Sequence, residues 1–324
     1  MKERVLAALE AASGYLSGAE ISRRVGRSRA AVWQWIEELR RDGYTIEASP
    51  RRGYRLVARP DRLYPWEVQR HLRTERIGRR IVYQERVDST NDWVRALAKE
   101  GAPEGLVAVA EEQLKGRGRR GRTWSSPFAK GVWSTTLLRP AIPPQAAPTM
   151  ALAAALAVAR AVEEVTGLAA AVKWPNDVLV GEKKVAGILV EMDAELDQVR
   201  SLAVGIGLNA NLEPDDFPPE ARSHATSLLL ALGRPVDRAA LLGALLNHLE
   251  RVYLRVLEGG LGAVLDDLRK RAAWLGFEVQ VTDGQRAWEG VARDIAPDGA
   301  LLVETAGGRL ERVYAADVSV RAAR

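Results

Sequence analysis

The hydrophobic residues of the first 41 positions recur every three or four residues, which is typical of amphipathic helices. This spacing predicts three helices, over residues 2–12, 18–25 and 29–41. Ser17 and Ser28 stand immediately before the second and third helices, where a serine side chain can accept a hydrogen bond from a free backbone N–H group. The chain is therefore expected to begin with a small helical module.

The pattern changes after the third helix, where two short strands are predicted over residues 44–48 and 53–57. Three helices followed by a hairpin is the order of a winged helix-turn-helix module, whose third helix enters the major groove of DNA. Residues off the hydrophobic face of that helix are candidates for base contacts, and the hairpin arginines for phosphate contacts. These candidates are Ser28, Arg29, Trp33, Gln34, Arg51 and Arg52. A three-helix module that binds another protein is the alternative.

The distribution of charge favours DNA binding. The formal net charge of the chain is +5. Residues 1–60 contain 12 Lys or Arg and 7 Asp or Glu, which leaves 35 residues of each sign in the rest of the chain. The excess positive charge therefore lies in the first module, and a basic module beside a neutral body suggests that the module binds a polyanion. A solvated basic surface is the alternative.

Strand and helix patterns alternate beyond a linker at residues 59–61. Helical spacing predicts a short helix over residues 63–72 and two helices within 241–273. Buried strands are predicted over residues 106–111, 183–191 and 202–209. Glycines inside the last of these strands, Gly205 and Gly207, permit close packing or the close approach of a ligand.

Four short strands are predicted near the C-terminus, over residues 277–281, 288–293, 300–304 and 309–314. Turn signals lie between them at Asp283-Gly284, Asp298-Gly299 and Gly307-Gly308. About 50 residues with this spacing predict a small β-barrel at the end of the chain.

The composition excludes several classes of protein. Hydrophobic residues make up 47% and charged residues 27%, which argues against a disordered or fibrous chain. Cysteine is absent, so no disulfide, thiolate zinc site or thiol nucleophile can form. The three histidines, at positions 71, 224 and 248, are too far apart in sequence to form a local metal or catalytic motif. The N-terminus lacks a signal peptide, and the longest apolar segment, 150–162, contains Arg160 and is too short to span a bilayer. A soluble cytoplasmic protein without a membrane partner is expected.

A segment rich in glycine and arginine carries the main chemical signal. Residues 116–121 match G-x-G-x-x-G, but a dinucleotide-binding fold also needs a following helix and an acidic residue about 20 positions later. The segment 122–127 is no helix start, no Asp or Glu occurs from 113 to 162, and no P-loop motif is present. Five Lys or Arg within residues 115–122 predict instead a mobile loop that a phosphate or carboxylate orders, with Trp124 placed to stack on a base. A solvated basic loop is the alternative.

Three further segments place polar side chains at the ends of predicted elements. Lys173, Asn176 and Asp177 lie on a turn after a strand, where they can contact a purine, a ribose or a magnesium ion. A lysine pair at 183–184 begins a strand, and such a lysine can stabilise a developing negative charge. The segment 88–91, Asp-Ser-Thr-Asn, is most simply a helix N-cap. For each segment taken alone, a structural turn, edge or cap is the simpler explanation.

In combination these segments resemble a biotin–protein ligase. The resemblance is carried by Asp88-Ser89-Thr90-Asn91, Gln113 with Gly116-Arg117-Gly118-Arg119-Arg120-Gly121-Arg122 and Trp124, Lys173-Trp174-Pro175-Asn176-Asp177, and residues 184–191, in the family's order and spacing. With the helical module in front, the whole chain is similar to the bifunctional bacterial form, which is also the repressor of the biotin operon. The resemblance implies an α+β fold of three domains. These are a winged helix-turn-helix domain at 1–61, a class II synthetase-like ligase domain with a mixed sheet at 62–273, and an SH3-like β-barrel at 274–324.

The resemblance also implies a role for each motif residue. Lys184 and Arg119 would be catalytic. Biotin would be bound by Ser89, Thr90, Asn91, Gln113, Arg117, Gly118, Arg119 and Lys184. ATP or the adenylate would be bound by Arg117, Arg119, Arg120, Arg122, Trp124, Lys173, Asn176 and Asp177. No metal motif is present, and Asp177 is the candidate for contact with the Mg²⁺ that accompanies ATP.

The activity implied by the resemblance has two steps. Biotin and ATP form biotinyl-5′-AMP, and a lysine of the biotin carboxyl carrier domain of acetyl-CoA carboxylase then takes the biotin. The expected partners are this carrier protein, operator DNA and a second copy of the chain, with biotinyl-AMP as corepressor. A lipoate–protein ligase, which shares the central fold, and a regulator that senses a small ligand without ligase activity are the alternatives.

Overall fold

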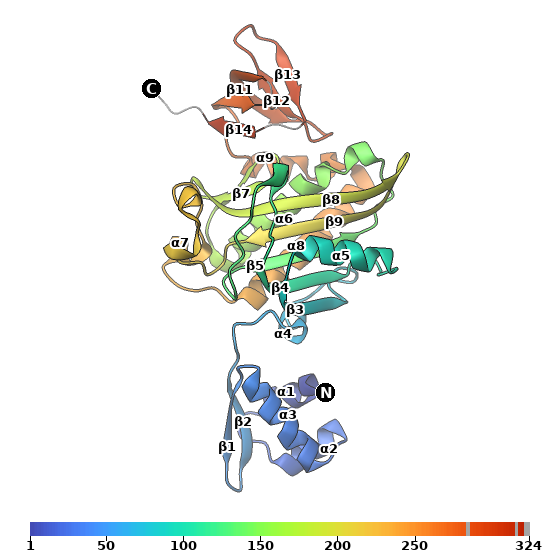
Figure 1. Ribbon diagram of the computed structural model, residues 1–324, viewed down its shortest axis with the longest axis vertical. Helices are drawn as coiled ribbons and strands as arrows, with labels where there is room; N and C mark the ends of the chain where they lie inside the picture. The colour runs from blue at the N-terminus through green and yellow to red at the C-terminus, as the bar shows by residue number, and fades with distance from the viewer. Residues whose placement is uncertain (283–285, 315–316, 321–324) are drawn as a thin grey trace. The chain divides into compact units, whose positions relative to one another are not determined.

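The computed structural model of the chain describes residues 1–282, 286–314 and 317–320 (Figure 1). The chain divides into two compact units, residues 1–62 and 63–324. Buried hydrophobic residues occur in both units, so each has a core of its own.

The first unit is a winged helix-turn-helix module. The helices α1 (Lys2–Glu10), α2 (Gly18–Val25) and α3 (Arg29–Arg41) precede an antiparallel hairpin of β1 (Thr45–Ser49) and β2 (Gly53–Ala58). Both predicted caps are confirmed, because the side chains of Ser17 and Ser28 accept hydrogen bonds from backbone N–H groups at 3.1 and 3.3 Å. All predicted elements of this unit are present, although α1 ends two residues before its predicted end.

A mixed sheet of seven strands forms the centre of the second unit (Figure 1). Its order is β3-β4-β5-β9-β8-β7-β6. The pair β3–β4 is parallel, and the other neighbouring pairs are antiparallel. The strands are β3 (Ile81–Val87), β4 (Val107–Gln113), β5 (Val132–Leu138), β6 (Ala170–Lys173), β7 (Asp177–Val180), β8 (Lys183–Glu195) and β9 (Gln198–Leu208). The three predicted strands correspond to β4, β8 and β9, with shifted ends.

Two long helices cover one face of this sheet (Figure 1). They are α6 (Thr149–Thr166) and α8 (Arg238–Gly259), and with α9 (Leu265–Arg271) they enclose the main hydrophobic core. The apolar segment 150–162, which was expected to be too short to span a bilayer, is part of the longer helical segment Pro144–Thr166. The length and composition of that longer segment would allow it to cross a membrane. Most of this segment is buried inside the fold, because α6 lies between the sheet and α8.

The opposite face of the sheet carries α5 (Thr90–Lys99), which contacts β4, β5 and β9. Val94 and Ala203 belong to a second, smaller core between α5 and the sheet. Side chains alternate along a strand, so Gly205 and Gly207 face the same side as Ala203. These two glycines border a cavity beside α5.

The remaining helices of the second unit are short. Only α4 (Pro65–Gln69) is helical in the segment predicted as a helix over residues 63–72, so that prediction was too long. α7 (Leu228–Leu232) was not predicted, and its N-cap is the side chain of Ser227. Two helices within 241–273 were predicted, and α8 and α9 confirm them, with α8 starting three residues earlier.

The C-terminal part of the second unit is an antiparallel sheet in the order β13-β12-β11-β10-β14. Its strands are β10 (Glu278–Thr282), β11 (Ala287–Ile295), β12 (Leu301–Glu304), β13 (Leu310–Val313) and β14 (Asp317–Val320). Four of these strands were predicted, and β14 was not. The predicted turn at 283–284 lies outside the described residues. Gly299 and Gly308 adopt positive φ values of 84° and 75°, which agrees with the other two predicted turns.

A buried ion pair joins the central sheet to the helical layer. The Nη1 atom of Arg238, at the start of α8, lies 2.9 Å from Oε2 of Glu111 on β4, and both side chains are fully buried. Arg238 also donates to the carbonyl of Gly131, and Glu111 accepts from the backbone N–H of Leu63 at 2.9 Å. These hydrogen bonds offset the cost of removing the two charges from water.

Replacing Arg238 with methionine is expected to lower the free energy of unfolding by about 3–5 kcal/mol, because Glu111 would remain buried without its positive partner. Urea denaturation followed by circular dichroism measures this change. Arg200→Met is the matched control, since Arg200 pairs with Glu195 on the surface and its loss should cost roughly 0–1 kcal/mol. Equal losses in the two variants would contradict the importance of the buried pair.

Candidate functional site

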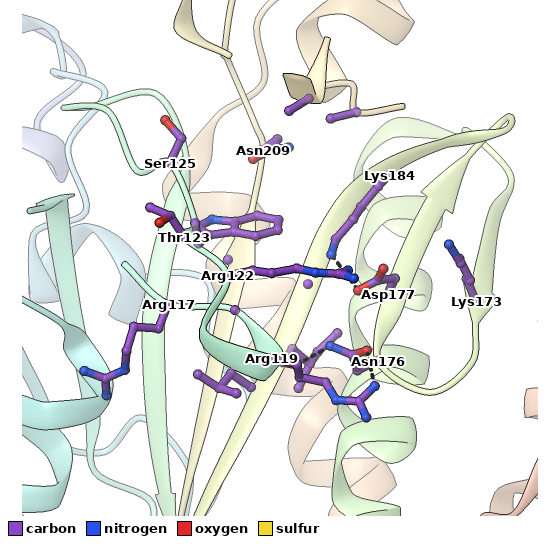
Figure 2. Close-up of a pocket in the computed structure, with 18 of the residues that line it drawn as sticks. Arg117, Arg119, Arg122, Thr123, Ser125, Lys173, Asn176, Asp177, Lys184 and Asn209 are labelled. Atoms are coloured by element: carbon purple, nitrogen blue, oxygen red, sulfur yellow. Dashed lines mark hydrogen bonds and ion pairs between the residues drawn. The ribbon is translucent and has the colours of Figure 1, made fainter. Parts of the chain in front are cut away.

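A cavity of about 470 Å³ lies on the sheet face that carries α5. Its lining comes from segments that are far apart in the sequence: the start of α5, the loop after β4, the turn between β6 and β7, and the strands β8 and β9. Figure 2 labels side chains of the loop after β4, of the turn between β6 and β7 and of β8 around the cavity.

The floor of the cavity is a patch of sheet without side chains. Gly187 on β8 and Gly207 on β9 are cross-strand partners, and Gly205 lies two residues before Gly207 on the same face. A Cβ atom at Gly207 would clash with the indole ring of Trp124, and one at Gly205 would clash with the carboxamide of Asn91. The glycines therefore let Trp124 and Asn91 lie directly on the backbone of the sheet.

Hydrogen bonds fix the polar side chains beside α5. The side-chain carbonyl of Gln113 accepts from the backbone N–H and the hydroxyl of Thr90, at 2.9 and 3.0 Å. The amide of Gln113 donates to the hydroxyl of Ser126 at 2.9 Å. The hydroxyl oxygen of Thr135 lies 2.8 Å from that of Thr90 and 2.7 Å from Oδ1 of Asn91. This network gives the carboxamide of Gln113 a single orientation at the cavity wall.

Ser89 occupies the N-cap position of α5, as predicted for the segment 88–91, but its side chain makes no capping hydrogen bond. Its φ and ψ of −154° and 133° are extended, and the residue is buried at the edge of the cavity. The simple interpretation of this segment as a helix cap was therefore wrong for the serine hydroxyl.

The arginine-rich loop has a defined backbone. The N–H of Gly118 donates to the carbonyl of Arg122 at 2.7 Å, and the N–H of Trp124 donates to the carbonyl of Gly116 at 2.9 Å. Within this tight turn Arg120 adopts a left-handed conformation with φ of 55° and is exposed. The side chains of the loop can therefore be assigned to particular sides of the cavity.

Arg117 is held by acidic residues of neighbouring elements. It forms two hydrogen bonds with the carboxylate of Asp92, at 2.6 and 2.7 Å, and lies 3.3 Å from Glu191 on β8. The hydrogen bonds from Arg117 lower the pKa of Asp92, and those to Asp92 raise the pKa of Arg117 above its usual range. Arg117 points away from Lys184 and Asp177 in Figure 2. It therefore anchors the loop to α5 and β8 in this structure.

Two other arginines of the loop point the opposite way. Arg119 donates to the side-chain oxygen of Asn176 at 3.2 Å, and Asn176 donates to the carbonyl of Ile188 at 2.8 Å. Arg122 extends toward Asp177 and the end of the Lys184 side chain in Figure 2. These contacts bring positive charge to the turn between β6 and β7.

Lys184 stands at the centre of this charged region. Its Nζ atom lies 2.7 Å from Oδ1 of Asp177 and 5.1 Å from the centre of the Trp124 ring. Its backbone is fixed on both sides, because its N–H donates to the carbonyl of His224 and its carbonyl accepts from the N–H of Thr226. The neighbouring residue Lys183 is exposed and is not part of the lining.

All residues that the sequence assigned to biotin or nucleotide binding line this one cavity. They are Ser89, Thr90, Asn91, Gln113, Arg117, Gly118, Arg119, Arg120, Arg122, Trp124, Lys173, Asn176, Asp177 and Lys184. Their proximity is a structural finding, while their individual roles remain predictions.

Sequence reasoning missed several residues of the site. Asp92 directly follows the segment 88–91, and Glu191 is the last residue of the segment 184–191. Both residues hold Arg117, but no local sequence pattern indicated that they contact the loop. Trp274, after α9, and residues between 217 and 225 also line the cavity, and they belong to no predicted motif.

The donor set fits a magnesium ion that arrives with a nucleotide. Among the described residues no group of three or more His, Cys, Asp or Glu could hold a metal ion. Asp177 supplies one carboxylate at the cavity, and Mg²⁺ is commonly bound by one or two carboxylates together with substrate phosphates. The residues therefore suit an ion that is shared with the phosphates of a bound nucleotide.

The predicted DNA-binding residues all lie on the surface of the first unit. Ser28, Arg29, Trp33, Gln34, Arg51 and Arg52 are exposed. Trp33 is 58% exposed, which is unusual for so large an apolar side chain. Arg52 lies over the ring of Tyr15, at 4.2 Å from its centre, and donates to the hydroxyl of Ser49. Arg52 is therefore held in one position on the wing.

Comparison with known protein families gives three matches along the chain. Residues 83–211 match the Biotin/lipoate A/B protein ligase family. Residues 2–55 match an HTH domain, and residues 275–321 match the Biotin protein ligase C terminal domain.

Individual relatives match nearly the whole chain. The "Bifunctional ligase/repressor BirA" of Bacillus subtilis is 40% identical over 311 residues, which are 96% of this chain and 95% of the relative. The protein of the same name from Escherichia coli is 28% identical over 98% of this chain and 97% of its own. Among solved structures, "Biotin protein ligase from Aquifex aeolicus in complex with biotin and ATP" is similar with a TM-score of 0.65 and 29% identity. It covers 76% of this chain and all of its own.

Replacing Asp92 with asparagine is expected to loosen the arginine loop, because the charged partner of Arg117 is lost. Trypsin should then cut after the arginines of the loop several-fold faster, as measured by limited proteolysis and mass spectrometry. Asp193→Asn on the exposed end of β8 is the control and should leave the cutting rate unchanged.

The pH dependence follows from the lowered pKa of Asp92. The ion pair is fully present above the ordinary aspartate pKa of 3.8 and is lost only as the pH falls below that value. Relative to the cutting of an unstructured arginine peptide by trypsin at the same pH, the cutting rate of the native loop should therefore not change between about pH 6 and 8, which is far above the Asp92 titration. Faster cutting at pH 6 than expected from the protease alone would contradict this anchoring.

Proposed function

The chain belongs to the family of bifunctional biotin ligases and repressors, and on that premise we propose that it attaches biotin to a carrier protein and regulates transcription. The observation that carries the proposal is the gathering of all four family-like segments around one cavity. The cavity combines a fixed polar wall, three or more cations and an indole ring, which suit a small polar ring system, phosphates and a base.

The first step joins biotin to the nucleotide. A carboxylate oxygen of biotin attacks the α-phosphorus of ATP, the bond from that phosphorus to the bridging oxygen breaks, and pyrophosphate leaves. Biotinyl-5′-AMP remains. Carboxylate and triphosphate repel each other, so the main task of the protein is to hold both among positive charges in the correct geometry.

Lys184 is the proposed catalytic cation between the carboxylate and the α-phosphate. Its fixed backbone and its position over Trp124 support this assignment. In the structure its charge is balanced by Asp177, so an incoming anion would replace a carboxylate that is already beside the ammonium group. The ion pair with Asp177 thus offsets part of the free-energy cost of removing the Lys184 ammonium group from water, and it does so before substrate binds.

The wall beside α5 is the proposed site of the biotin ring. Ser89, Thr90, Asn91 and Gln113 present hydroxyl and carboxamide groups that can pair with the N–H and carbonyl groups of a ureido ring. Gly118 of the arginine-rich loop lines the same cavity and is proposed to contact biotin as well. The hydrogen bonds of Gln113 support the assignment because they orient its carboxamide in advance.

The charged side of the cavity is the proposed site of ATP. Arg119, Arg120, Arg122 and Lys173 would contact phosphates, with Arg119 also acting on the reacting phosphate, and Trp124 and Asn176 would contact the adenylate. Asp177 would contact a Mg²⁺ bound to the phosphates, and that ion would supply charge neutralisation. Arg117 was expected to bind both substrates. Its pairing with Asp92 favours a second role, in which it anchors the loop that covers the intermediate.

The second step transfers biotin to protein. The amine of a lysine attacks the carbonyl carbon of the mixed anhydride, AMP leaves with the electrons of the broken C–O bond, and the amine loses a proton to water. We propose that the lysine belongs to the biotin carboxyl carrier domain of acetyl-CoA carboxylase. The biotin ligases among the relatives favour this substrate over the lipoyl transfer of a lipoate–protein ligase.

The proposed boundaries of the three domains are 1–61, 62–273 and 274–324, and the proposed location is the cytoplasm.

The first domain would bind operator DNA through Arg29, Trp33 and Gln34 of α3. Ser28 would lie at the start of this interface, and Arg51 and Arg52 would contact phosphates. Their common exposure supports this assignment. Since one small module binds DNA weakly, we further propose that biotinyl-AMP promotes a homodimer that occupies two half-sites.

Lys184→Ala is expected to slow biotin-dependent exchange of pyrophosphate into ATP by on the order of 100-fold, as for the loss of one preorganised donor. Lys183→Ala is the matched control, because this neighbouring lysine is exposed outside the cavity and its loss should leave exchange unchanged. Normal exchange in Lys184→Ala would remove this lysine from the mechanism. Absence of exchange in the native protein would favour the regulator that only senses a ligand.

Biotin plus ATP is expected to raise both the dimer fraction and the affinity for DNA, because a ligand that favours the dimer also favours binding to paired half-sites. Analytical ultracentrifugation measures the first effect, and titration of a DNA fragment selected from a random pool measures the second. Deleting residues 1–60 should abolish DNA binding and leave pyrophosphate exchange. A DNA affinity that is the same with and without biotin and ATP would contradict biotinyl-AMP as a corepressor.

A further inference from the structure

Trp274 lies at the junction between the central sheet and the C-terminal sheet. The N–H of the preceding residue, Ala273, donates to the carbonyl of Val172 on β6 at 2.8 Å. The carbonyl of Trp274 accepts from the N–H of Phe277 at 3.0 Å. The N–H of Gly276 donates to the carbonyl of Ala292 on β11 at 2.7 Å. The backbone of Trp274 is thus tied to both sheets.

The backbone of Trp274 adopts a conformation that bulky residues rarely take. Its φ is +74°, in the left-handed region. A residue other than glycine in this region is strained, and the conformation persists only where the surroundings impose it. The hydrogen bonds on either side impose it here, and the result is an indole ring that lines the cavity.

The ring of Trp274 faces the ammonium group of Lys173. The Nζ atom of Lys173 lies 4.5 Å from the centre of the ring, within the range of a cation–π interaction. Both residues line the cavity that contains Lys184 and Asn176. Lys173 comes from the end of β6, so the contact joins the start of the turn between β6 and β7 to the segment between α9 and β10.

An aromatic partner has a consequence that a carboxylate would not have. Asp177 is the cross-strand partner of Lys173, but its Oδ1 atom is 2.7 Å from Lys184. The face of an indole attracts a cation and carries no net charge, so the contact with Trp274 does not itself repel a phosphate. A carboxylate in the same place would compete with the phosphates of ATP.

We propose that Trp274 is a positioning residue that holds Lys173 toward the phosphates of ATP. The proposal rests on the proposed ligase function and adds a residue from outside the four family-like segments. It also gives the C-terminal sheet a specific part in nucleotide binding, because the hydrogen bond between Gly276 and Ala292 ties the position of the indole to β11. Thr282 of β10 lines the cavity as well.

The test separates the two substrates. In Trp274→Ala the KM for ATP in pyrophosphate exchange should rise by roughly 3- to 30-fold, which is the size of one cation–π contact, while the KM for biotin stays the same. Trp274→Phe should restore most of the affinity for ATP, because it keeps an aromatic face. Trp274→Leu should behave like the alanine variant, and it serves as the aliphatic comparison if the alanine variant does not fold.

A double variant shows whether Trp274 acts through Lys173. Lys173→Met removes the cation, so adding Trp274→Ala to it should not raise the KM for ATP further. Additive effects would mean that Trp274 acts independently of Lys173 and would overturn the proposal. Equal changes in the KM for ATP and for biotin, or no change in either, would also overturn it.

Trp288→Ala is the matched control. Trp288 lies on β11, packs against the same hydrophobic core and does not line the cavity. Its loss should weaken the C-terminal sheet without raising the KM for ATP. A selective rise in Trp288→Ala equal to that in Trp274→Ala would assign the effect to the sheet and overturn the positioning role. Native protein without biotin-dependent exchange would instead refute the ligase function itself.

Discussion

The site depends on a stretch of sheet that carries no side chains. Gly187 and Gly207 are paired across β8 and β9, and with Gly205 they leave the backbone bare on the face of α5. Trp124 and Asn91 occupy the space that Cβ atoms would fill, so two residues from distant segments lie directly against the floor. The opposite face of the same strands carries the branched residues of the main core. One pair of strands therefore supplies both the rigidity of the fold and the depth of the cavity.

The cations of the site differ in the groups that lie beside them. Arg117 is paired with Asp92 in a geometry of two parallel hydrogen bonds, which is strong and holds the loop in place. Lys184 has one carboxylate beside it, and Lys173 has an aromatic ring. A reaction between a carboxylate and a triphosphate needs both an ordered loop and positive charge beside the reacting groups. Arg117 fixes the loop, and Lys184 is the proposed cation at the reacting groups.

The sequence predicted most accurately the features that depend on residues close together in the chain. The caps at Ser17 and Ser28 and the helical spacing between them depend on local backbone groups, and the structure contains them as predicted. The gathering of the motif residues in one cavity followed from the family resemblance. The partners of Arg117 and of Arg238 could not be predicted in this way, because each pair joins elements that only the folded sheet brings together. The left-handed backbone of Trp274 is likewise imposed by hydrogen bonds to two separate sheets.

The same physical requirement connects the proposed chemistry with the proposed regulation. A mixed anhydride reacts with water, so an enzyme that forms one before its protein substrate arrives must cover it and release it slowly. A ligand that stays bound for a long time in a closed site also reports that biotin is present and has not yet been transferred. The loop that Arg117 anchors is therefore suited to both tasks without a second ligand site. Regulation of the basic winged-helix unit then requires only that this bound state shift the proposed equilibrium between monomer and dimer. The remainder of the chain is nearly neutral and adds little nonspecific attraction to DNA.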